Sequence, residues 1–319
     1  MSFTISNNSA AASSNYYLGK NQELLQTSIK RLASGKKIIR PSDDPGSLSV
    51  AMKLNASISR LTGAKNNVQN GTSFLEVQDG VLEGVGRIVT RMAELKGLGS
   101  QDPMKSSQDI ESYNLEFRDL QRQLYDMSQM TFNGVSLFAN YANNGSTESV
   151  FKSASTNHTV SIHTSTQGSA GSKISLHKAA LLAALTMTND TAKTAVAFSS
   201  SKHTGTGKAG GSDIISFAAS VSNKTWNLDA VSMGVFQQAL ENIAYLRAHV
   251  GGQMSRLSFA ADTLSVQQTN IRAALGRIED VDIAEESSNL SKYNILTQAA
   301  ASMLVQANST NDVAMMLLR

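Results

Sequence analysis

The sequence predicts a mainly α-helical fold in which long helices from the two ends of the chain pair in a coiled-coil-like bundle, with a small β-containing outer region inserted between them. Two observations carry this prediction. Apolar residues alternate at spacings of three and four residues over long stretches near both ends, which is typical of a coiled coil. The last of the 3 prolines among the 319 residues is Pro103, so the long stretches after it can remain helical.

Composition excludes several classes of protein. The formal net charge is only +3 and the basic residues are interspersed with acidic ones, so no nucleic-acid partner is expected. The absence of cysteine excludes disulfides and thiol chemistry. No apolar run reaches the roughly 18 residues of a membrane span, and the first twenty or so residues lack the basic start and apolar stretch of a secretory signal. No membrane partner is therefore expected.

The first region, residues 20–130, has helical periodicity. A stripe of Leu25, Ile29 and Leu32 precedes the stretch RPSDDPGS at 40–47. Its two prolines disfavour helix in the residues before them, so a break is expected there, with Ser42 or Asp43 capping the next helix.

A longer helix is predicted over 48–96. Its apolar seam consists of Leu54, Ile58, Leu61, Val68, Leu75, Leu82 and Val89, with poorer core residues at Lys65, Thr72, Asp79 and Gly86. A second, adjacent stripe contains Val81, Val85, Ile88, Met92 and Leu95. Two stripes indicate a helix with more than one neighbour. GLGSQDP at 97–103 is expected to end it, and another helix is predicted over 105–128.

The middle region, 131–228, favours loops with some β-structure. Asn133-Gly134 is a strong tight-turn pair. Alternation predicts a strand at 158–165, and a second strand is expected at 212–221. LHKAALLAALT at 176–186 resembles a short helix.

The last region, 231–319, returns to helical spacing. Its seam consists of Leu240, Ile243, Val250, Met254, Leu257, Leu264, Ile271, Leu275 and Ile278. An acidic interruption is expected at 279–289, followed by a final helix that leads to the apolar ending NDVAMMLLR. Two paired ends cannot bury stripes on several faces, so the surplus apolar surface predicts contacts with other copies of the chain.

No catalytic, cofactor or metal site is expected, and no feature favours an enzyme. The spacing of the histidines fits no standard metal motif. TGTGKAGGS at 204–212 fails as a phosphate loop because Lys202 and Ala209 stand where the motif needs Gly and Ser or Thr. EDVDIAEE lacks the spacing and central glycine of a calcium loop, so a helix start or hinge is the better interpretation.

Three segments resemble the bacterial flagellins. They are RLASGKKIIRPSDDPGSLSVAMKL at 31–54, FNGVSLF at 132–138 and RIEDVDIAEESSNLSKYNILTQAAASMLVQAN at 277–308, and the ending LLR is similar too. The resemblance covers about 1–140 and 229–319. Residues 141–228 match nothing comparable.

The resemblance implies a structural subunit that self-assembles into the extracellular flagellar filament for motility, after export in unfolded form by the flagellar secretion apparatus. It implies terminal inner-tube helices at 1–45 with 284–319, disordered in the monomer. A helical core domain with a hairpin would comprise 46–140 with 229–283. Residues 141–228 would be a variable, surface-exposed region with at most a small outer domain.

The resemblance also implies partners and contact residues. The self-assembly residues would be Leu25, Ile29, Leu32, Leu290, Leu296, Met303, Leu304, Val313, Met316 and Leu317. The partners would be further copies of the chain, a secretion chaperone on the carboxy-terminal helix, the filament cap and the hook–filament junction proteins. The alternative is that the chain is itself a junction adaptor with flagellin-like ends.

A receptor contact is implied as well. Toll-like receptors recognise the core helices of many flagellins, and Arg91, Glu94, Leu95 and Glu116 match the family's contacting residues. Thr90, Ala93 and Gly97 depart from the recognised type, which carries Gln, Arg and a larger apolar residue there.

Overall fold

The structure is a computed structural model that describes residues 8–100, 105–139, 159–165, 167, 170–188, 214–218 and 225–317. The side chains of residues 100, 188, 214, 215 and 311–317 are outside that description. The chain divides into two compact units, Met1–Ser59 with Gln267–Arg319 and Arg60–Val266. The domain boundaries predicted at 45/46 and 283/284 follow the helix breaks instead, and they stay a prediction.

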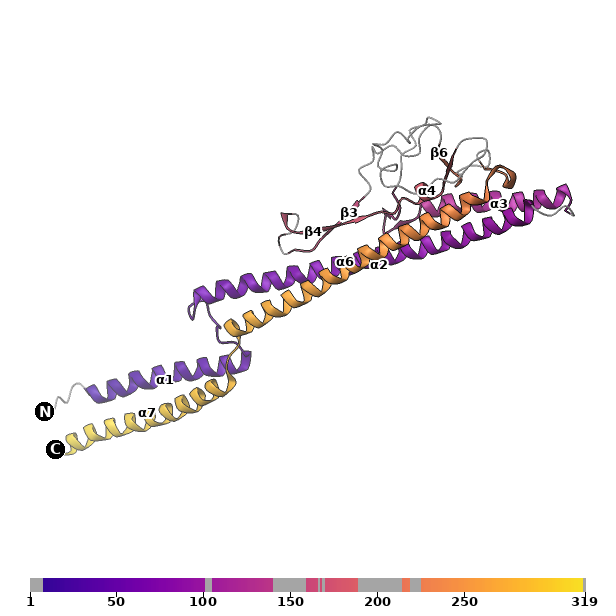
Figure 1. The fold of residues 1–319 in the computed structure, drawn as a ribbon. Coiled ribbons are helices and arrows are strands. Elements are labelled where there is room, and N and C mark those ends of the chain that lie inside the picture. The colour runs from indigo at the N-terminus through magenta and orange to yellow at the C-terminus, as the bar shows by residue number, and fades with distance from the viewer. Residues whose placement is uncertain are drawn as a thin grey trace. The chain divides into compact units, whose positions relative to one another are not determined.

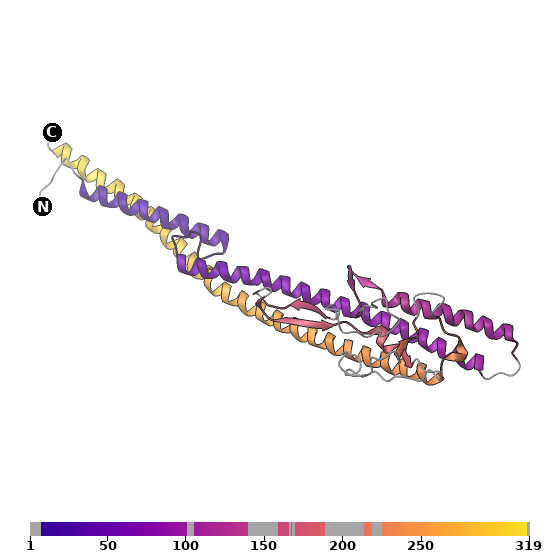
Figure 2. The same cartoon turned by 90° about the horizontal axis from the view of Figure 1, so that it is seen from above.

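In the first unit, helix α1 (Ser9–Ser34) lies antiparallel to helix α7 (Ile283–Leu317), as Figures 1 and 2 both show. The Asn8 side chain caps α1 by accepting a hydrogen bond from the Ala11 amide at 3.0 Å. Gly35 ends α1 in the left-handed conformation with φ 70°, which glycine adopts without steric cost.

The predicted break after α1 is confirmed, but its cap is one residue further on. Asp44, not Ser42 or Asp43, caps helix α2 (Pro45–Ser100) by accepting from the Ser47 amide at 3.0 Å. Asp43 instead accepts from the Ile39 and Arg40 amides, so it closes the turn before the helix. Pro45 occupies the first helical position, where its missing N–H has no partner to lose.

The second break is shorter than predicted. Helix α6 (Met233–Glu279) and α7 are separated only by 280–282, because Asp282 starts α7 by accepting from the Ala284 amide at 2.9 Å. Of the acidic residues that were expected to interrupt the helix, Glu285 and Glu286 occupy the first turn of α7. Negative charge there is stabilised by the positive end of the helix dipole.

The second unit is built on α2 and α6, which run side by side, with helix α3 (Ser107–Ser128) packed beside them (Figure 1). Most of the seam predicted on α2 is buried, whereas on α6 fewer than half of the predicted seam residues are buried and the others are half-buried. On α2 and α6 the buried seam residues are Leu61, Val68, Leu75, Leu82, Val89, Ile243, Val250, Leu257 and Leu264. The second α2 stripe is buried at Val85, Met92 and Leu95, and α3 supplies Phe117, whose ring lies 5.9 Å from that of Phe236 on α6.

Short antiparallel pairs make up the β-structure. Strands β1 (Thr131–Phe132) and β2 (Val135–Ser136) join through Asn133 and Gly134, both at positive φ, as the Asn-Gly pair predicted. β3 (Thr159–His163) pairs with β4 (Lys173–His177), and β5 (Thr186–Thr188) pairs with β6 (Ile214–Ser216). The 3-10 helix η3 (Leu228–Ala230) precedes α6.

The helix predicted over 176–186 is wrong over much of its length. Only α4 (Leu181–Ala184) is helical, while Leu176 and His177 end β4 and residues 186–188 form β5. Tertiary pairing with β3 and β6 overrides the helix propensity of this alanine-rich stretch. The β3–β4 hairpin also comes close to α2, since a Cβ on Gly71 would lie 2.1 Å from Ile162 Cδ1.

Candidate subunit interface

The α1–α7 pair exposes large apolar side chains that neither helix covers. On α7 these are Ile283, Ile295, Leu296, Met303 and Val305, and on α1 they are Tyr16, Tyr17 and Ile29. Ile295 is 66% exposed and Met303 62% exposed. Because Ile295 and Met303 do not share one stripe with Val305, α7 is apolar on more than one side, which is typical of a helix with several neighbours.

Sequence reasoning found part of this surface. Of the predicted residues, Ile29, Leu296 and Met303 are exposed, while Leu25, Leu32, Leu290 and Leu304 are half-buried. The side chains of Val313, Met316 and Leu317 lie outside the described residues. That these ten residues make subunit contacts stays a prediction.

Several apolar residues in the pair were missed by the sequence analysis. Tyr16, Tyr17, Ile283, Ile295 and Val305 are all exposed. A search for a single stripe passes over Ile295 and Val305, since they stand beside Leu296 and Leu304, which were already assigned to one. Runs of adjacent apolar residues, such as Ile295-Leu296 and Met303-Leu304-Val305, could have indicated them. Successive positions on a helix point in different directions, so such runs make more than one side of the helix apolar.

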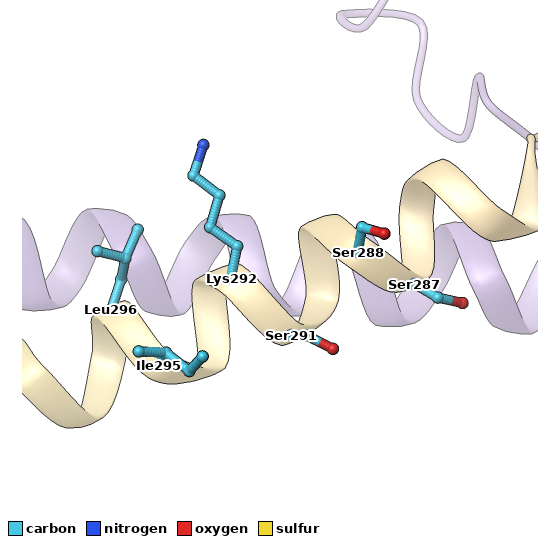
Figure 3. A pocket seen from close by; sticks show the side chains of 6 residues that line it. All are labelled: Ser287, Ser288, Ser291, Lys292, Ile295 and Leu296. Atoms are coloured by element: carbon cyan, nitrogen blue, oxygen red, sulfur yellow. The ribbon is translucent and has the colours of Figure 1, made fainter.

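Figure 3 shows a shallow hollow on α7 with small polar and large apolar side chains. It is lined by Ser287, Ser288, Ser291, Lys292, Ile295 and Leu296, all from α7 itself. Small serine side chains beside the exposed Ile295 leave a recess that an apolar side chain of another chain could enter. No acidic or histidine side chain lines the recess.

Polar contacts fix how α1 and α7 lie together. The Asn8 side chain donates to the Ala307 carbonyl at 2.8 Å, and Arg31 forms an ion pair with the nearly buried Glu286 at 3.8 Å. Near the ends of α1 and α6, the Lys37 amide donates to the Glu279 carbonyl at 2.7 Å and the Val281 amide donates to the Gly35 carbonyl at 3.1 Å. These contacts set the register of the pair, whereas few apolar side chains in it are fully buried.

The residues that match the receptor contact form an ion-pair cluster on the second unit. Arg91 Nε donates to Glu116 at 2.8 Å, and Arg91 also pairs with Glu94 at 3.2 Å. Arg91 and Glu94 are exposed and Glu116 is half-buried, and these carboxylates raise the pKa of Arg91, with the Glu116 hydrogen bond as the largest cause. Leu95 is 0% exposed and belongs to the core.

Within the described residues, no group of three or more histidine, aspartate or glutamate side chains is arranged to hold a metal ion. Across the same residues, no helix has the length and apolar character needed to span a membrane.

Extended paired helices with an uncovered apolar surface at both chain ends define a protein of the self-assembling structural class. Comparison with known proteins gives the family. The bacterial flagellin N-terminal helical region matches residues 5–143, and the bacterial flagellin C-terminal helical region matches residues 233–318.

Whole-chain relatives agree. Flagellin of Listeria innocua serovar 6a is 30% identical over 303 residues, which cover 95% of this chain and 94% of that protein. Flagellin of Bacillus subtilis strain 168 is 28% identical over 326 residues and covers 99% of both chains. The chain belongs to the bacterial flagellin family. It is a structural component of the extracellular flagellar filament and not an enzyme.

A solved structure is similar in fold. A putative flagellar hook-associated protein from Vibrio parahaemolyticus aligns with a TM-score of 0.52 and 14% identity, over 75% of this chain and 100% of that one. At this identity the similarity concerns the fold alone.

Proposed function

We propose that this flagellin polymerises through its α1–α7 pair, and that the predicted self-assembly residues of both helices make the subunit contacts. The observation that carries the proposal is the exposure of large apolar side chains on both helices, led by Ile295, Met303 and Val305. Burying one such side chain is worth roughly 1.5–3 kcal/mol, so a helical polymer that covers several of them gains substantial stability.

We propose that the terminal segments 1–45 and 284–319 order only when the subunit joins the filament and line its inner tube. The segments 46–140 and 229–283 would form the core around it, and 141–228 would face outward. The shortage of fully buried apolar side chains in the α1–α7 pair supports this order of events, because burial within the pair alone is small compensation for the conformational entropy lost.

We propose that the chain is exported unfolded by the flagellar secretion apparatus. A chaperone would shield the apolar carboxy-terminal helix, and the filament cap and hook–filament junction proteins would be further partners. The absence of cysteine supports this route, since no disulfide can close the chain before export.

We also propose that a Toll-like receptor recognises the free subunit, on the condition that the ion pairs of Arg91 open. Arg91, Glu94 and Glu116 would be available at the surface of a free subunit, but Arg91 would have to exchange its two carboxylate partners for receptor groups. Leu95 could contribute only by supporting the backbone from the core, because its side chain is buried.

The test is electron microscopy of the purified chain with short filament seeds, alongside two variants. One lacks residues 313–319, and the other carries Ile295→Ser with Met303→Ser. We expect filaments from the wild type and few or none from either variant. A matched control, Leu115→Ser, changes an exposed leucine on α3 and leaves the α1–α7 pair intact. Filaments from both test variants at wild-type yield would contradict the assigned contacts.

The same experiment separates the junction-adaptor alternative from the polymer proposal. An adaptor would bind hook ends without elongating on seeds. A wild-type chain that stays monomeric on filament seeds but binds hook ends would replace the polymer proposal.

A further inference from the structure

The junction between the β3–β4 hairpin and the rest of the second unit is held by a glutamine on α6. The His177 amide donates to Gln253 Oε1 at 2.7 Å, and Gln253 Nε2 donates to the His177 carbonyl at 3.2 Å. Gln253 is only 3% exposed, so water is poorly placed to replace these bonds. One side chain therefore satisfies both backbone groups of the last residue of β4.

These two bonds fix which way the Gln253 amide faces. Turning the amide over would set its NH₂ group against the His177 N–H and its oxygen against the His177 carbonyl. The NH₂ group of the fixed amide also lies 3.0 Å from Nδ1 of His249, one turn earlier on α6. An NH₂ group can only donate, so His249 Nδ1 must accept and the ring must be neutral with its proton on Nε2.

The two ionisable groups that act on His249, His177 and Arg256, both disfavour a positive charge on it. The His177 ring lies 6.0 Å away on β4, and Arg256 is on α6 with His249. Lys178, the next residue after β4, is nearly buried. The carboxylates Asp79 and Glu83 on α2 are both engaged by Arg247.

The direction of the His249 pKa agrees with this geometry. His249 lies at the exposed surface, and desolvation of its ring, followed by the nearby His177 and Arg256, lowers its pKa below the ordinary value. A histidine whose pKa is lowered by folding stabilises the folded arrangement above its ordinary pKa. That stabilisation is lost as the pH falls through the lowered value.

We propose that His249, Gln253 and the His177 backbone form a pH-sensitive latch that holds the β3–β4 hairpin on α6 while His249 is neutral and loosens when His249 gains a proton. Protonation places an N–H on Nδ1 opposite the Gln253 NH₂ group. It also adds a cation beside His177 and Arg256. Unless the exposed His249 ring swings into water instead, Gln253 then turns or withdraws, and either movement breaks its bonds to the strand.

The latch responds to pH in a different range from the ion pair that joins the long helices α2 and α6. Asp79 of α2 accepts from Arg247 of α6 at 2.8 and 3.0 Å, and these bonds lower the pKa of Asp79. That ion pair persists until the pH falls below the ordinary range of aspartate. Moderate acidification therefore loosens the hairpin and leaves α2 and α6 joined.

The same unit contains a comparable clamp without a histidine. Gln121 on α3 accepts from the Trp226 amide at 2.9 Å and donates to the Trp226 carbonyl at 2.9 Å. Both clamps join a buried glutamine on a helix to both backbone groups of one residue. No histidine is bonded to Gln121 among the described contacts, so Trp226 provides an internal reference for the effect of pH on such a clamp.

The test is amide hydrogen exchange of the full chain between pH 8 and pH 5, with each rate corrected for its intrinsic pH dependence. We expect protection of the His177 amide, relative to that of Trp226, to fall about five- to tenfold, which is the factor that one ordinary hydrogen bond accounts for. In His249→Asn, whose side-chain oxygen can accept from Gln253 without titrating, the ratio should stay constant. His163→Asn on β3 should behave as the wild type.

A constant ratio in the wild type would overturn the latch, and so would an equal fall in His249→Asn. A second measurement does not depend on a variant. The ¹⁵N shifts of His249 at pH 8 should show the proton on Nε2, and a proton on Nδ1 would equally overturn the proposal. Neither result bears on filament formation, which the seeded assembly experiment tests by itself.

Discussion

The α1–α7 pair and the α2–α6–α3 assembly use similar helices with opposite results. In the second unit, the seam residues of α2 and α6 are almost fully buried, as at Leu75 and Leu257. In the α1–α7 pair, the residues that lie deepest include Ser28 and Glu286, while Ile295 and Met303 remain exposed. Long helices of comparable apolar content are thus covered by their own chain in one unit and left uncovered in the other.

The difference shows where stability must come from in each unit. α2 has α6, α3 and the β3–β4 hairpin around it, so one chain supplies all of its neighbours. α1 and α7 have mainly each other, and two helices cannot cover apolar residues on several sides. On the proposed assembly, their stability would depend on further copies of the chain, as expected where folding is coupled to assembly.

The largest effect is expected from Leu75→Ala in the core. Leu75 is fully buried on α2, so its truncation should lower the free energy of unfolding of the free subunit by roughly 2–5 kcal/mol. Urea denaturation followed by circular dichroism measures this. A loss below about 0.5 kcal/mol, the scale of surface substitutions, would mean that the second unit is not a self-sufficient core.

The opposite pattern is expected from Met303→Ser on α7. The subunit should keep its free energy of unfolding to within about 0.5 kcal/mol, because Met303 makes little contact within its own chain. The concentration needed for filament growth should rise about tenfold or more, the equivalent of one lost apolar side chain. Sedimentation of assembled filaments gives the second value. A subunit destabilised as strongly as by Leu75→Ala would erase the contrast between the two units.

A third comparison uses the left-handed residue that ends α1. Gly35→Ala places a Cβ at φ 70°, at a cost of about 1 kcal/mol. If the terminal helices order only on assembly, this cost should appear in filament growth and not in unfolding of the free subunit. Gly134→Ala, at φ 77° in the β1–β2 turn, is the matched control in the second unit and should lower subunit stability directly.

The smallest effect is expected from Asp79→Asn, which removes the ion pair with Arg247. The Arg247 side chain is 39% exposed and the Asp79 side chain is 34% exposed, so water screens the pair. The free energy of unfolding should therefore fall by about 0.5–1 kcal/mol. The pKa of Asp79 is lowered in the folded chain, so its contribution is present above the ordinary aspartate pKa and is lost as the pH falls through the lowered value. The free energies of unfolding of the variant and the wild type should therefore converge in acid. A constant difference between them down to pH 2 would contradict this assignment.

Residues close together in the sequence determined much of the architecture. The heptad spacing predicted α2 and α6, most of the buried seam of α2 and part of that of α6, and Asn133-Gly134 predicted the β1–β2 turn. These features depend on periodicity and local backbone preference, which a single sequence carries directly. The segments at 31–54 and 277–308 likewise indicated the family.

Only the tertiary structure decided which apolar residues are covered. Leu95 and Leu296 have the same side chain on predicted helices, yet one is buried and the other exposed. The tertiary structure also converted part of the predicted helix at 176–186 into β4 and β5, and it brought Gln253 to His177. Burial and pairing depend on which distant segments come together, because the free energy of a contact is set by both partners and a local pattern contains only one of them.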